Sequence, residues 1–277
     1  MPQTANHSEY VIHSDDEPRR LDRQAAMYGT EDDLRFAALP EVADVLDAGC
    51  GSGSAARLFA SSRTRCSVVG LDRNAQYLDY ASRQAVASGL SNVRFQQGDV
   101  LALPFEDSSF DVVWSKHLLQ WVRERENAIA EFVRVTRPGG RIVACNFDGF
   151  CLQHHPVDPI VQADVEAWFT AAQRELGFDN MLGRKLPAMF KAAGLQNVTV
   201  DIIADKAFSG FGGGAERAWN WEMQWRSAFQ FSVKVFGSAE GAEAARKKGR
   251  GNWQQLNDYA TMKNYFKQTP QLSCRRV

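Results

Sequence analysis

The sequence lacks an excess of either charge. Its 32 Lys and Arg residues nearly cancel its 33 Asp and Glu residues, which leaves a formal net charge of −1. Proteins that bind nucleic acids or anionic membranes generally carry a basic surface, so we expect neither partner. One basic stretch, residues 245–251 (ARKKGRG), is open to two interpretations, a local basic patch or a solvated helix end followed by a loop.

Cysteine pairs and long apolar runs are also missing. The five cysteines form no C-x-x-C pair, so neither a zinc site nor a thioredoxin-like dithiol is expected. No run approaches the roughly 18 apolar residues that a membrane-spanning helix needs, and the polar N-terminus has no signal-peptide core. We therefore expect a cytoplasmic protein without a metal ion, and the sequence leaves a homo-oligomer open.

Strand-like and helix-like segments alternate along the first half of the chain. Such alternation predicts an α/β fold with a mostly parallel sheet and helices on both faces. After residue 150 the alternation breaks, and residues 205–265 read as a helical insertion before a final edge strand at 270–277. This divides the chain into an N-terminal arm and helix (1–40), a core (41–150) and the remainder of the same domain (151–277). The strand-like segments, seven in all, are 43–49, 66–72, 93–100, 109–115, 141–147, 196–205 and 270–277.

The stretch VLDAGCGSG (45–53) follows the first predicted strand. Ligands of open parallel sheets bind at the carboxyl ends of strands, and glycine lets the backbone turn sharply and approach a ligand. A dinucleotide site has the spacing G-x-G-x-x-G, whereas this spacing is G-x-G-x-G. Asp47, inside the motif, would repel a pyrophosphate and attract a cationic ligand, which argues against NAD and for a positively charged adenosyl cofactor.

This motif resembles the D/E-x-G-x-G-x-G motif of class I S-adenosyl-L-methionine (SAM)-dependent methyltransferases, which have a Rossmann-like fold. VVGLDRN (68–74), QQGDVLALPFEDSSFDVVWS (96–115) and EFVRVTRPGGRIVACNF (131–147) are similar to further segments of that family. The resemblance implies that Asp72 binds the ribose hydroxyls and that Asp99 and Val100 contact the adenine. The other cofactor-binding residues that we expect in this core are Asp47, Gly49, Gly51, Gly53, Arg73 and Ser115.

The segment Tyr10–Gln24 resembles one that precedes the core in the ubiquinone/menaquinone-like, small-molecule branch of the family. There the helix is a lid over the cofactor. The resemblance implies cofactor contacts for Tyr10, Arg20 and Gln24, and a substrate contact for Tyr28. The other interpretation is a helix that packs on the sheet edge with solvated arginines.

Two segments are candidates for contacts with the methyl acceptor. WSKHLLQWV (114–122) follows the fourth strand and offers His117 as a general base, with Gln120 and Trp121 shaping the pocket. A hydrogen-bonded histidine at a helix start is the other interpretation of His117. His154 and His155 suggest substrate contacts in a loop, because no third ligand supports a metal site.

The aromatic segment 219–236 offers Trp219 and Trp225 as substrate-binding residues. Aromatic residues at helical spacing equally fit an ordinary core. Aromatic faces also stabilise cations, so we expect a hydrophobic small molecule of specialised metabolism, terpenoid or indole alkaloid. The chain is similar to prenyl C-methyltransferases of the teleocidin type, which favours C-methylation slightly over N- or O-methylation. The alternatives are a quinone methyltransferase, an NAD-dependent oxidoreductase and a non-catalytic SAM-binding protein.

Overall fold

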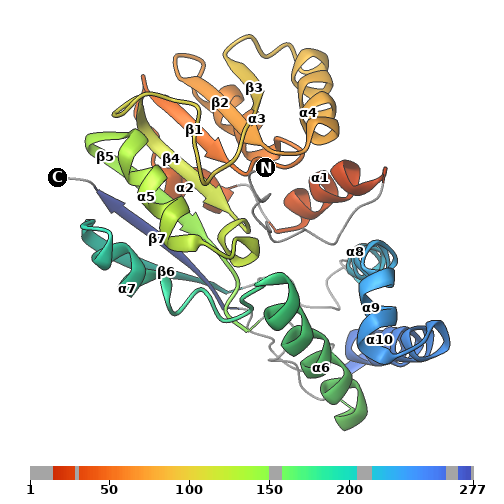
Figure 1. Cartoon of the computed structure of the whole chain (residues 1–277). Coiled ribbons are helices and arrows are strands. Elements are labelled where there is room, and N and C mark those ends of the chain that lie inside the picture. Colours follow the sequence, from red (N-terminus) through yellow and green to blue (C-terminus); the bar gives the residue numbers. More distant parts are fainter. Residues whose placement is uncertain (1–14, 29–30, 150–157, 205–213, 260–267, 276–277) are drawn as a thin grey trace, which may run out of the picture.

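The computed structural model describes residues 15–28, 31–149, 158–204, 214–259 and 268–275 (Figure 1). The strands are β1 (Asp44–Ala48), β2 (Ser67–Asp72), β3 (Val93–Gln97), β4 (Phe110–Lys116), β5 (Thr136–Cys145), β6 (Gln196–Ala204) and β7 (Gln268–Arg275). The helices are α1 (Glu17–Tyr28), α2 (Glu31–Ala37), α3 (Ser54–Ser62), α4 (Ala75–Ala87), the short 3-10 helix η1 (Leu119–Trp121), α5 (Arg125–Val135), α6 (Pro159–Leu176), α7 (Leu186–Ala192), α8 (Gly214–Ser227), α9 (Phe229–Phe236) and α10 (Ala239–Tyr259).

Within the described residues, the strands form one sheet in the order β3-β2-β1-β4-β5-β7-β6. The pairs from β3 to β5 are all parallel, which confirms the expected α/β fold with a mostly parallel sheet. β7 is antiparallel to both β5 and β6. The expectation of a final edge strand is therefore wrong, because β7 lies between two strands and β6 is at the edge.

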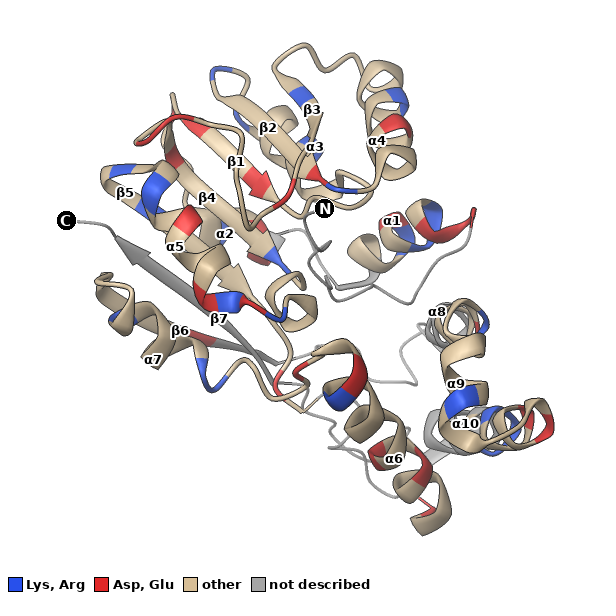
Figure 2. Cartoon of the chain, in the orientation of Figure 1, with Lys and Arg blue, Asp and Glu red and all other residues tan. Residues whose placement is uncertain are grey.

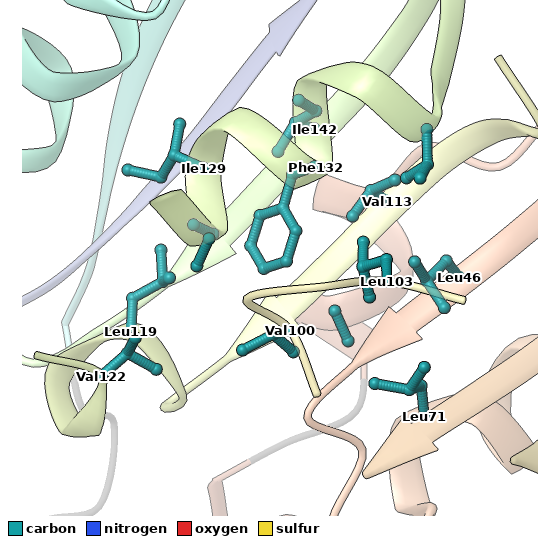
Figure 3. Close-up of a cluster of buried hydrophobic side chains, with 14 of the residues drawn as sticks. Leu46, Leu71, Val100, Leu103, Val113, Leu119, Val122, Ile129, Phe132 and Ile142 are labelled. Atoms are coloured by element: carbon teal, nitrogen blue, oxygen red, sulfur yellow. The ribbon is translucent and has the colours of Figure 1, made fainter. Parts of the chain in front are cut away.

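Successive residues of the central strands alternate between two hydrophobic clusters. Leu46, Val113 and Ile142 belong to one cluster, while their neighbours Val45 and Val112 belong to the other. Side chains of a strand point alternately to opposite faces, so each cluster covers one face. Figure 3 shows the first cluster, in which Phe132 and Ile129 of α5 lie over side chains of the sheet. Helices α2 and α3 supply the helical residues of the other cluster.

Proline and paired glycines such as those of RPGG (137–140) ordinarily form a turn. This segment lies instead within β5, which begins at Thr136 directly after α5. The pairing with β4 shifts its register here, since Phe110 lies opposite Thr136 and Val112 opposite Arg141. The extra residues are accommodated at this irregularity in the ladder, where Gly139 has a φ of +77°.

Helices α8, α9 and α10 follow one another between β6 and β7 in the chain. Together with α6 they gather beyond the ends of the central strands (Figure 1). The basic stretch 245–251 lies inside α10 and is not the helix end and loop that one interpretation gave. Acidic and basic residues are interspersed along these helices (Figure 2). Among the described residues, none of the helices is long and apolar enough to cross a membrane.

Candidate functional site

A cavity of about 350 Å³ lies at the carboxyl ends of the parallel strands. Its wall combines the loops after β1 to β5 with residues of α1, α6, α8 and α10. This volume is in the usual range for small-molecule sites. The cavity therefore joins a part formed by the sheet to a part formed by the later helices.

The glycine loop follows β1, where Gly49 and Gly51 line the cavity. Gly49 has a φ of +74°, and a Cβ atom built on it would lie 2.7 Å from Leu118 Cδ1. Gly49 and Cys50 both donate their amide hydrogens to the carbonyl of Leu71 in β2, at 2.8 and 2.9 Å. Only glycine fits this conformation without strain. Gly53 does not line the cavity: it is the N-cap of α3 and packs against Phe95.

Asp72, at the end of β2, is held by the loops on both sides of it. Its Oδ2 accepts a hydrogen bond from the amide of Gly51, and its Oδ1 accepts one from the amide of Asn74, each at 2.9 Å. Burial raises the pKa of this carboxyl, although the backbone amides oppose the shift. A carboxylate has about four lone-pair sites, so Asp72 retains the capacity to accept a further hydrogen bond at the cavity wall. The neighbouring wall includes the expected cofactor residues Arg73, Asp99 and Val100.

Asp47 lines the cavity at the end of β1 and is 2% exposed. Its Oδ2 accepts a hydrogen bond from the amide of Ala56 in α3 at 3.0 Å. Its pKa is raised to about 7, chiefly by burial; the carboxylates of Asp33 and Asp72 contribute to this rise, and the hydrogen bond from Ala56 opposes it. A cation bound in the cavity would relieve this repulsion and favour the ionised form.

A buried ion pair that sequence reasoning missed lies in the same wall. The Nζ atom of Lys116, the last residue of β4, donates to both carboxylate oxygens of Asp33 in α2, each at 2.8 Å. Burial lowers the pKa of Lys116, but the carboxylate of Asp33 outweighs this effect and leaves the pKa raised. Both residues line the cavity. The two positions are 83 residues apart in the chain, so no local pattern connects them.

Helix α1 lies against the cavity and is fixed by its own side chains. Arg20 is 1% exposed and donates to both carboxylate oxygens of Glu17, at 2.7 and 2.6 Å, and to Oε1 of Gln24 at 2.6 Å. The solvated-arginine interpretation is therefore wrong for Arg20. Asp22 joins the helix to the core through a bidentate contact with Arg57 of α3, at 2.8 and 2.9 Å. Arg20 and Gln24 both line the cavity. Tyr10 lies outside the described residues, as does the side chain of Tyr28.

His117 follows β4 and lines the cavity. It has a φ of +58°, a left-handed conformation that is rare for residues other than glycine. Its amide donates to the carbonyl of Cys145 at 2.7 Å, and its ring stacks on Phe147 with 4.1 Å between centroids. These contacts at the ends of β4 and β5 thus fix the imidazole at the cavity wall. Ser115, which precedes it by two residues, is fully buried and does not line the cavity.

Gln120 and Trp121 line the cavity as expected. Oε1 of Gln120 accepts a hydrogen bond from the amide of Phe147 at 3.3 Å. The Trp121 ring contacts Phe178 at 4.3 Å, and Phe178 contacts Phe169 at 5.7 Å. These contacts begin a continuous row of aromatic rings along the wall, which ends at Trp168 of α6, 5.3 Å from Phe169.

The two tryptophans expected in the substrate pocket differ in position. Trp225 lines the cavity and stacks on Phe236 at 6.2 Å. Trp219 does not line it, and instead its ring lies under the guanidinium of Arg23, with 3.7 Å from Cζ to the ring centroid. This cation–π contact joins α8 to α1. His154 and His155 lie outside the described residues.

Sequence reasoning missed the contribution of α6 to the cavity. Residues 161, 164, 165, 168 and 169 line it, at the i, i+3, i+4, i+7 and i+8 spacing of one helix face. That spacing was visible in the sequence, but nothing in the sequence told a cavity face from a core face. Within the described part of the chain, no cluster of three or more His, Cys, Asp or Glu residues is placed to hold a metal ion.

Comparison with known proteins gives this arrangement a family context. Residues 46–144 match the model of a methyltransferase domain. The demethylmenaquinone methyltransferase of Lactococcus lactis subsp. lactis (strain IL1403) is 33% identical over 135 residues, which make up 48% of this chain and 51% of that protein. The chain spans about half the length of the curated relatives it matches, or less. Over its first half the chain is therefore similar to methyltransferase domains.

Two solved structures are similar over most of the chain. The [4+2]-cyclase SpnF has a TM-score of 0.56 and 21% identity, and the match covers 91% of this chain and 81% of that one. A geranyl diphosphate methyltransferase in complex with GPP and sinefungin has a TM-score of 0.54 and 18% identity, with 89% and 76% covered. At these identities the likeness establishes a shared Rossmann-like α/β fold.

Proposed function

We propose that the protein transfers a methyl group from SAM to a hydrophobic small molecule, and that it favours C-methylation of a prenyl or alkene group over N- or O-methylation. The observation that carries this proposal is the set of residues that line the cavity described above. Its end at the sheet has the glycine loop and buried carboxylates, and its other end has a row of aromatic rings.

The sheet end of the cavity suits the cofactor. Asp72 would bind the ribose hydroxyls, since it accepts from backbone amides and has lone pairs to spare. Asp47 and the Asp33–Lys116 pair would hold the charged methionine part. Bound there, SAM supplies an electrophilic methyl group. α1 would then act as a lid, because Arg23 joins it to Trp219 of the helical insertion while Asp22 joins it to the core.

The aromatic end suits an apolar acceptor. In C-methylation, an alkene uses its π electrons to form the new carbon–carbon bond as the methyl–sulfur bond breaks, which leaves a carbocation on the acceptor. The faces of Trp121, Trp168 and Trp225 would stabilise that charge. Loss of a proton then completes the reaction, and His117 is the residue of this wall best suited to accept it. The likeness to a geranyl diphosphate methyltransferase supports a prenyl acceptor.

Two alternatives have specific support. A quinone methyltransferase is favoured by the demethylmenaquinone methyltransferase among the relatives. A reaction other than methyl transfer is favoured by the fold likeness to a cyclase. The test is incubation with SAM carrying a deuterated methyl group and either geranyl diphosphate or demethylmenaquinone, followed by mass spectrometry. A labelled geranyl product supports the proposal, a labelled quinone supports the first alternative, and SAM binding without any labelled product supports the second.

A further inference from the structure

The cavity face of α6 is apolar except at one position. Val161, Val165, Trp168 and Phe169 line the cavity together with Asp164. The indole Nε1 of Trp168 donates to Oγ of Ser232 at 3.1 Å, so the polar edge of this ring is satisfied by α9. Among the described cavity residues that α6, α8 and α10 contribute, Asp164 alone carries a charge.

The carboxylate of Asp164 has an acceptor atom to spare. Its Oδ2 is buried and accepts no hydrogen bond from the described residues. Nζ of Lys248 lies 3.8 Å from this Oδ2, beyond hydrogen-bond distance, and belongs to a side chain that is 50% exposed. Such exposed ion pairs contribute little to stability. The ion pair with Lys248 is therefore too weak to account for the presence of a carboxylate in this apolar part of the cavity wall.

A buried acceptor without a donor is unfavourable, because it loses its hydrogen bonds to water and gains none. Valine or leucine at position 164 would continue the apolar stripe of α6 at no such cost. We propose that Asp164 is a specificity-determining residue that accepts a hydrogen bond from a donor nitrogen or oxygen on the acceptor molecule. The substrate class is then a prenylated or aromatic molecule with a polar N–H, ammonium or O–H group on an otherwise apolar body. This inference rests on the proposed function of the aromatic end.

Three probes of one shape test it: geranylamine, geraniol and geranyl methyl ether. They share a prenyl chain and differ in the head group, which is an ammonium, a hydroxyl donor or an ether without a donor. Their affinities are measured by isothermal titration calorimetry on the whole chain saturated with S-adenosylhomocysteine. We expect the wild type to bind geranylamine at least about tenfold more tightly than the ether, since hydrogen bonds to charged groups are strong. If geraniol also binds tightly, the site requires only a hydrogen-bond donor. If geraniol does not bind tightly, the site requires a cation.

Asp164→Leu, which removes the acceptor, should abolish the preference for geranylamine while leaving affinity for the ether within about twofold. Asp164→Asn keeps an acceptor but not the charge and should reduce the preference. Glu166→Gln is the matched control, because Glu166 lies on the exposed side of the same helix and pairs with Gln162. Equal affinities for the three probes in the wild type, failure of geranylamine to bind, or a preference that survives in both Asp164 variants would overturn the inference. Binding is measured without methyl transfer, so failure of the proposed function would be seen separately, as absence of a labelled product.

Discussion

Replacing Asp47 with asparagine should make the protein less sensitive to alkaline pH. The carboxyl is 2% exposed, and burial raises its pKa from 3.8 to about 7. A carboxyl whose pKa is higher in the folded state stabilises the fold fully below its unfolded pKa, and this stability is lost as the pH rises through the folded pKa. A shift of about 3 units corresponds to about 4 kcal/mol, of which about 2 kcal/mol is lost between pH 5.5 and pH 8.

Asparagine has the same shape, keeps an acceptor for the amide of Ala56, and does not ionise. The free energy of unfolding, measured with urea at pH 5.5 and pH 8, should therefore fall by about 2 kcal/mol less in Asp47→Asn than in the wild type. The buried carboxyls of Asp33 and Asp72 also have raised pKa values, so the difference between the two proteins reports the ionisation of Asp47 together with its coupling to these two carboxyls. Identical pH dependence in wild type and variant would refute the account of Asp47 as a buried, repelled carboxylate.

Three further predictions concern the site. Asp72→Ala should weaken binding of S-adenosylhomocysteine by about a hundredfold, measured by calorimetry. The control Asp79→Ala, at an exposed position, should leave the affinity unchanged. Unchanged affinity in Asp72→Ala would refute the assignment of Asp72 to the ribose. Gly49→Ala should lower the free energy of unfolding by at least about 1 kcal/mol more than Gly89→Ala. The two glycines have similar φ values, but a Cβ at position 49 clashes with Leu118 whereas position 89 has open space. Equal losses in the two variants would refute the tight packing at Gly49. His117→Ala should lower kcat less than tenfold if the acceptor is an alkene, because His117 then accepts a proton only after the methyl group has been transferred. A loss of a hundredfold or more would indicate that a general base is essential for the methyl transfer itself.

Local pattern was enough to predict the cofactor half of the fold. The segment from β1 to α4 has short strands, a glycine loop and helices that are specified by neighbouring residues, and β1 and β2 lie within the predicted segments 43–49 and 66–72. Gly49, Gly51 and Asp72 meet at the cavity because the strands that precede them are adjacent and parallel. Because the carboxyl ends of parallel strands lie at the same edge of the sheet, residues that follow different strands come close together.

Features that depend on distant pairing were not predictable in the same way. The position of β7 between β5 and β6 depends on antiparallel pairing across the whole second half of the chain. The Lys116–Asp33 pair joins a strand end to a helix of the N-terminal region. Trp219 was expected in the substrate pocket from its place in an aromatic segment of the helical insertion. Whether its ring faces the cavity or a cation on another helix depends on the packing of α8 against α1.

The central claim is methyl transfer to a hydrophobic acceptor, and one measurement tests it most directly. The protein is incubated with SAM carrying a deuterated methyl group and with prenyl compounds, geranyl diphosphate among them, and the extract is examined by mass spectrometry. The account predicts a product heavier by one labelled methyl group on a carbon of the prenyl chain. Binding of SAM with no labelled product from any prenyl compound or quinone would contradict it.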